Sequence, residues 1–127
     1  MYCETAVTKI LVIDNDENSL LLISDFLAFN NFQALTADNS QLGLQLAREQ
    51  QPNLIICELA LPEQNGYEVL KQLRSEPTTA NIPIWFLSFE TDIATRRRAL
   101  QQGADNYFTK PVNLNELLLA INNFFSE

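Results

Sequence analysis

Four polar side chains with the chemistry of an anion or cation site each follow a short run of residues that is typical of a β-strand. They are Asp14, Glu58, Ser88 and Lys110, and they follow the runs at 10–13, 54–57, 84–87 and 106–109. Carboxylates bind cations, whereas hydroxyl and ammonium groups donate hydrogen bonds to anionic oxygens. Any one of them could be a chance strand end, but all four types together predict a functional cluster.

The elements that must position these side chains alternate along the chain. Besides the four runs above, a weaker strand is expected at 33–37, and apolar residues recur with helical spacing between the strands. We expect Ser40 to cap the second helix, and Thr91 or Asp92 to cap the fourth. Alternating strands and helices imply an α/β fold whose parallel sheet carries helices on both faces. Ligands of such sheets bind outside the carboxyl ends of the strands, which is where the four polar residues lie.

Length and composition restrict the function further. The chain has 127 residues with 46% hydrophobic residues, which predicts a single globular domain over 1–127. The net charge of −8 disfavours nucleic acid or an anionic membrane as partner. Residues 1–9 lack a secretory signal and no apolar run could span a membrane, so a cytoplasmic location is expected. With no histidine and no Cys-x-x-Cys pair, Cys57 is expected to be a buried free thiol and Cys3 to lie in the N-terminal tail.

The chain resembles the receiver domains of two-component response regulators from Lys9 to Phe125. The resemblance is carried by Ile-Leu-Val-Ile-Asp14, by the loop Leu-x-x-Pro62-x-x-x-Gly66, by Ser88, and by Gly103-Ala-Asp-Asn-Tyr107 leading into Lys110-Pro111. It implies a three-layer, flavodoxin-like (βα)5 fold with a doubly wound parallel sheet of order 2-1-3-4-5. It also implies a signalling protein of a phosphorelay rather than an enzyme.

The resemblance assigns a role to each polar residue. Members of the family bind Mg²⁺ through an acidic pair, which here falls on Asp14 and Asn15, and through an aspartate that accepts a phosphoryl group from a histidine kinase. That phosphoacceptor position falls on Glu58, so the metal ligands would be Asp14 and Glu58. The positions that contact the phosphoryl oxygens fall on Ser88 and Lys110, and the aromatic switch falls on Tyr107.

Two of these positions depart from the family pattern. Asn15 removes a negative charge from the metal site, and Glu58 is longer than aspartate by about 1.5 Å. We therefore expect weak or absent Mg²⁺ binding and a direct pair between Glu58 and Lys110. The leading interpretation is a degenerate phosphorylation site in a pseudo-receiver, which acts as a phosphorylation-independent protein-interaction module.

Three alternatives stay open at this point. The chain could be a working phosphoacceptor that uses Mg²⁺, with Glu58 or Asp16 filling in. Asp14-Asn15-Asp16 also matches the Asp-x-Asp nucleophile motif of haloacid-dehalogenase-like phosphatases, although the later Gly-Asp-x-x-x-Asp motif of that family is missing. The third alternative is that Asn15 and Glu58 were engineered to fix an active-like state.

The resemblance also implies a partner surface. A protein partner is expected to bind the face made by the helix at 92–103, the strand at 106–109 and the helix at 113–124, near Phe89 and Tyr107. For Phe89 exposure and packing under the helix are both open, as are a buried and a switching role for Tyr107. Arg96, Arg97 and Arg98 span about 200° of a helix, so we expect solvated charges and no shared anion site. The chain is either a stand-alone adaptor of the chemotaxis-regulator kind or the receiver of a larger protein.

Overall fold

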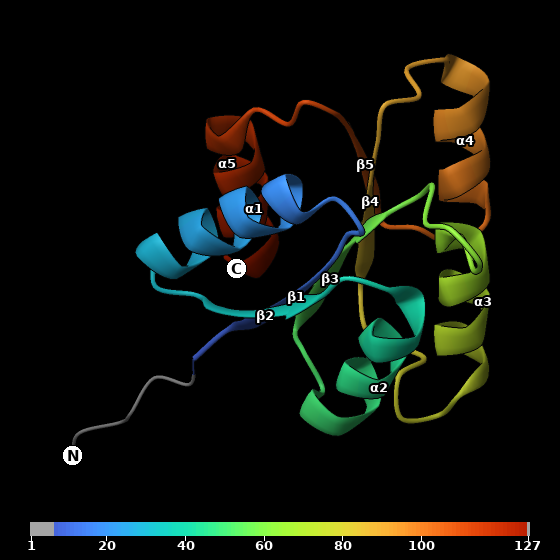
Figure 1. Ribbon diagram of the computed structural model, residues 1–127, viewed down its shortest axis with the longest axis horizontal. Helices are drawn as coiled ribbons and strands as arrows, with labels where there is room; N and C mark the ends of the chain where they lie inside the picture. Colours follow the sequence, from blue (N-terminus) through green and yellow to red (C-terminus); the bar gives the residue numbers. More distant parts are fainter. Residues whose placement is uncertain (1–6, 127) are drawn as a thin grey trace.

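The five strands form one parallel sheet in the order β2-β1-β3-β4-β5. The computed structural model describes residues 7–126 (Figure 1). The strands are β1 (Lys9–Ile13), β2 (Gln33–Ala37), β3 (Leu54–Glu58), β4 (Ile84–Ser88) and β5 (Asn106–Thr109). The predicted parallel sheet and its strand order are therefore confirmed.

Five helices cover the two faces of this sheet. They are α1 (Glu17–Phe29), α2 (Ser40–Gln50), α3 (Gly66–Ser75), α4 (Ile93–Gln101) and α5 (Leu114–Phe125). Figure 1 shows α1 and α5 on one face and α2, α3 and α4 on the other. This is the doubly wound, flavodoxin-like arrangement that the sequence predicts.

Each face of the sheet has its own apolar core, because successive strand residues point to opposite faces. Along β1, Ile10 and Val12 pack with α1 and α5, whereas Leu11 and Ile13 pack with α2 and α3. The central strands are buried on both sides, which explains why they read as continuous apolar runs. The helix α4 contributes only Ala99 to the buried residues, so it is the helix with the least apolar anchoring.

The structure corrects one of the two helix caps that the sequence predicts. Asp16 caps α1 by accepting from the backbone N–H of Asn18. The cap of α2 is Asn39, whose side chain accepts from the N–H of Leu42, and Ser40 is the first helical residue, so the expected Ser40 cap is wrong. Asp92 precedes α4 but makes no capping hydrogen bond through its side chain.

Two predictions about the rest of the chain have different outcomes. Cys57 is a buried free thiol, as expected, and burial raises its pKa above the ordinary range. Cys3 lies outside the described residues. Within residues 7–126, no helix is both long enough and apolar enough to cross a bilayer.

Candidate functional site

The four polar residues singled out by the sequence come together at the carboxyl edge of the sheet. Glu58 and Ser88 are the last residues of β3 and β4, and Asp14 and Lys110 directly follow β1 and β5. All four are buried, with at most 8% of the residue surface exposed. They line a hollow of about 280 Å³, which we call the acid pocket. The other residues that line it are Asn15, Asp16, Ala60, Phe89 and Glu90.

Lys110 joins the two buried carboxylates of the acid pocket. Its Nζ lies 2.7 Å from Oδ2 of Asp14 and 2.5 Å from Oε1 of Glu58. The carboxylate of Glu58 reaches the ammonium group from the end of β3. The pair that the sequence predicts between Glu58 and Lys110 is present, and Asp14 shares the same charge.

The two remaining carboxylate oxygens are held by the backbone. Oδ1 of Asp14 accepts from the N–H of Asp16 at 2.9 Å, and Oε2 of Glu58 accepts from the N–H of Ala60 at 2.9 Å. Each of the four carboxylate oxygens therefore has a donor from the chain itself. Buried charges are tolerated when they are paired and hydrogen-bonded in this way.

The electrostatics keep Lys110 protonated. Burial acts to lower the pKa of its ammonium group, but the hydrogen bonds and charges of Asp14 and Glu58 outweigh burial and raise the pKa above the usual 10.5. Protonated Lys110 donates hydrogen bonds to both carboxylates throughout the physiological pH range. One internal cation therefore offsets one of the two buried negative charges and pairs with both carboxylates.

The donor set around Lys110 does not fit a Mg²⁺ site. Mg²⁺ demands octahedral oxygen ligands and is usually held through carboxylates. Two of the carboxylates that line the acid pocket are buried, and both pair with Lys110. Asn15 is exposed and offers a neutral amide, while Asp16 uses its carboxylate to cap α1. Among the residues the structure describes, no group of three or more acidic, cysteine or histidine side chains could hold a metal ion.

Ser88 and Tyr107 are linked through the loop between β4 and α4. Oγ of Ser88 accepts from the N–H of Glu90 at 3.1 Å, and the Tyr107 hydroxyl donates to the carbonyl of Glu90 at 2.8 Å. Tyr107 is buried, and burial is the main reason that its pKa is raised, against a lowering by Ser88. Its hydroxyl is hydrogen-bonded to the backbone of the loop that precedes α4, so this bond joins β5 to that loop.

Phe89 lies at the rim of the acid pocket and is 68% exposed, so it does not pack under α4. The Lys110 Nζ lies 5.5 Å from the centre of its ring, within the range of a cation–π contact. Of the two arrangements that the sequence left open for Phe89, the structure has the exposed one.

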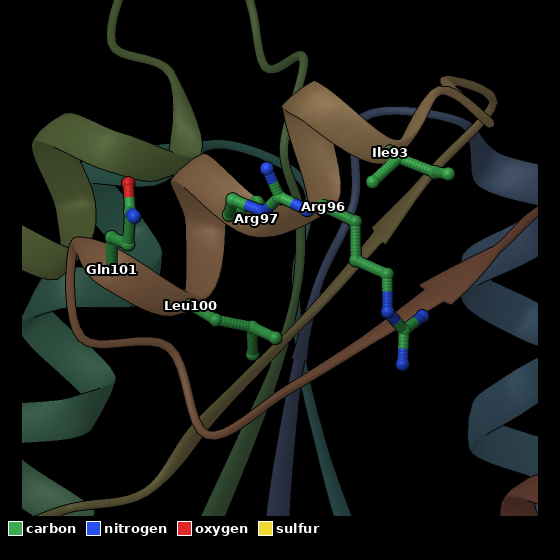
Figure 2. Close-up of a pocket in the computed structure, with 5 residues that line it drawn as sticks. All are labelled: Ile93, Arg96, Arg97, Leu100 and Gln101. Atoms are coloured by element: carbon green, nitrogen blue, oxygen red, sulfur yellow. The ribbon is translucent and has the colours of Figure 1, made fainter.

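The three arginines of α4 have distinct surroundings that the sequence does not reveal. Arg98 lies over the ring of Tyr67, 4.3 Å from its centre, and Arg96 donates to the carbonyl of Tyr107 at 3.1 Å. Arg96 and Arg97 line one hollow on α4 (Figure 2), whereas Arg98 does not, which agrees with the expectation that the three arginines share no single site. Tyr67 was missed altogether because its partners come from α4 and β4, far along the chain.

Comparison with known proteins gives a consistent result. Residues 10–122 match the model of the response regulator receiver domain. The chain is 30% identical over 117 residues to the regulatory protein AtoC of Escherichia coli, covering 92% of this chain and 25% of AtoC. It is 28% identical over 116 residues to the protein PilH of Pseudomonas aeruginosa, covering 91% of this chain and 96% of PilH.

The solved structures show the same fold. The crystal structure of a putative response regulator from Chloroflexus aurantiacus superposes with a TM-score of 0.87 at 26% identity, covering 93% of this chain and 97% of that one. The chain thus spans a quarter of AtoC but nearly all of PilH and of the Chloroflexus regulator.

Proposed function

The chain belongs to the family of response regulator receiver domains, and on that premise we propose that its phosphorylation site is degenerate. We assign the phosphoacceptor position to Glu58, the acidic pair to Asp14 and Asn15, the phosphoryl-contact positions to Ser88 and Lys110, and the switch to Tyr107. In this proposal the domain works in two-component signalling as a protein-interaction module whose binding does not depend on phosphorylation.

The observation that supports this proposal most strongly is the double pairing of Lys110. Its ammonium lies between Asp14 and Glu58, where an incoming phosphoryl group would need a free cation. Both carboxylates are also held by backbone N–H groups. A phosphoryl donor would have to break these bonds before any transfer, because in-line transfer needs close positioning of the acceptor.

Asn15 and Glu58 support the proposal together. With Asn15 in place of an acid, Lys110 faces two carboxylates, Asp14 and Glu58, and relieves their repulsion without a metal. Glu58 directs its carboxylate toward the ammonium and not toward solvent, being 5% exposed. Mg²⁺ binding by Asp14 and Glu58 is accordingly proposed to be weak or absent.

Receiver domains interact with histidine kinases, and this chain is proposed to bind a protein partner through the face of α4, β5 and α5. Phe89 and Ile93, which are 68% and 70% exposed, lie in the β4–α4 loop and at the start of α4. The buried Tyr107 connects the acid pocket to this face through Glu90. No nucleic acid or membrane partner is proposed, since the chain carries a net charge of −8.

The test is a titration of the isotope-labelled protein with Mg²⁺ and then with beryllofluoride, a phosphoryl mimic, followed through backbone amide shifts. We expect no saturable shifts at Asp14, Glu58, Ser88 or Lys110. The double variant Asn15→Asp/Glu58→Asp is the matched control, because it restores the family's acids in the same chain. It should show saturable shifts that extend to Tyr107. Equal responses of the unsubstituted chain and the variant would refute the degenerate site.

A further inference from the structure

The surface of α4 carries a patch that pairs positive charge with exposed apolar groups. The patch, which we call the α4 patch, consists of Ile93, Arg96, Arg97 and Leu100 and lines a hollow of about 410 Å³ together with Gln101 (Figure 2). Ile93 and Leu100 are 70% and 42% exposed. They are seven residues apart, so they lie on one side of the helix about 10 Å from each other, with the two arginines between them.

The positive charge of the α4 patch is not neutralised within residues 7–126. Elsewhere in that part of the chain, Lys110, Arg48 and Arg74 form ion pairs with acidic side chains. Arg97 has no hydrogen bond or ion pair to any described residue. Arg96 uses one N–H group to bond the carbonyl of Tyr107, which leaves its other donors open. Figure 2 shows this side chain reaching from α4 toward β5.

The surroundings of the α4 patch limit what can approach it. The protein has sixteen acidic residues against eight basic ones, and the exposed Glu90 and Asp92 lie immediately before α4. A nucleic acid or an anionic bilayer presents negative charge over a wide area, so it would meet these acids together with the arginines. A short acidic segment can meet the arginines alone.

We propose that the α4 patch binds an acidic protein segment in which two apolar side chains flank a pair of carboxylates. The carboxylates pair with Arg96 and Arg97, and the apolar side chains cover Ile93 and Leu100. This inference rests on the proposed function, because it gives the chemistry of the partner for the α4 side of the proposed face. It commits to a partner protein, and association of two copies of this chain is an outcome of the test.

The experiment titrates a short synthetic peptide into the isotope-labelled protein. The peptide carries one leucine, two adjacent glutamates and a second leucine, spaced along its chain as the four residues of the α4 patch are spaced along theirs. The expected result is saturable amide shifts confined to α4 and β5, with an affinity that falls as salt is raised. The same peptide with glutamine in place of glutamate should not bind. Arg97→Glu should weaken binding about tenfold, since it replaces attraction with repulsion.

Lys71→Glu is the matched control, because Lys71 is an exposed cation on α3 and the substitution changes the net charge equally. It should leave the affinity unchanged. Equal weakening by both variants, or equal binding of the glutamine peptide, would overturn the proposal. So would concentration-dependent dimerisation through α4, or binding to phosphatidylserine vesicles that Arg97→Glu abolishes while the peptide gives no shifts.

The titration is repeated with Mg²⁺ and beryllofluoride to separate this inference from the proposed function. Peptide binding that occurs only with both reagents would uphold the α4 patch and overturn phosphorylation-independent binding. Binding that is absent under both conditions would overturn the α4 patch and leave the degenerate acid pocket untouched.

Discussion

The acid pocket and the α4 patch both depend on positive charge, but they use it in opposite ways. In the acid pocket, Lys110 is buried and binds two carboxylates of its own chain. On α4, Arg97 is exposed and pairs with no acid among residues 7–126. Removing one partner of a buried ion pair leaves an uncompensated buried charge, whereas removing an exposed, unpaired charge costs the fold little. We therefore expect substitutions in the acid pocket to cost much stability and substitutions in the α4 patch to cost little.

The largest expected effect comes from removing the internal cation. Lys110→Met leaves Asp14 and Glu58 as buried carboxylates without a counter-ion, so we expect a loss of about 3–5 kcal/mol in the free energy of unfolding. Urea unfolding measures this loss of stability. Arg97→Met is the matched change on α4 and should cost less than about 0.5 kcal/mol, because that side chain is exposed.

A second substitution separates charge from packing in that result. Glu58→Gln in the Lys110→Met background removes one of the two unpaired charges, so it should recover part of the lost stability. If Lys110→Met and Arg97→Met had similar costs, the contrast between the two regions would be wrong.

The next effect is the pH dependence that Lys110 imposes. Its pKa in the folded protein is raised above the ordinary 10.5, so the folded state holds this proton more tightly than the unfolded chain does. Its contribution is therefore complete below pH 10.5 and is lost as the pH rises through the folded-state pKa. Unfolding experiments at increasing alkaline pH should show a steeper loss of stability in the unsubstituted chain than in Lys110→Met. Parallel curves would contradict the pairing.

The smallest expected effects concern two tyrosines beneath α4. The Tyr107 hydroxyl donates to the carbonyl of Glu90, whereas the buried hydroxyl of Tyr67 has no hydrogen-bond partner among the described residues. Tyr107→Phe should therefore destabilise the protein by about 1 kcal/mol, and Tyr67→Phe should be neutral or stabilising. Thermal unfolding of both variants checks the sign. If Tyr67→Phe lowered the stability as much as Tyr107→Phe, the hydroxyl of Tyr67 would have to make a hydrogen bond after all.

How much the sequence predicts differs between these regions for physical reasons. The sheet and the convergence of Asp14, Glu58, Ser88 and Lys110 follow from strand runs that end in polar residues, because parallel strands share one carboxyl edge. The sharing of Lys110 by two carboxylates depends on side-chain distances that spacing alone does not specify. The contact of Arg98 with Tyr67 joins residues on two different helices, so no local sequence pattern predicts it. The Asn39 cap was missed because Asn39 and Ser40 are both good capping residues.

The central claim is that the acid pocket is closed by its own lysine and does not accept a phosphoryl group. The most direct test is intact-mass spectrometry after incubation with Mg²⁺ and acetyl phosphate, with Asn15→Asp/Glu58→Asp treated in parallel. We predict no mass increase for the unsubstituted chain and the addition of one phosphoryl group to the variant. A phosphoryl adduct on Glu58 of the unsubstituted chain would contradict the account and identify a working receiver.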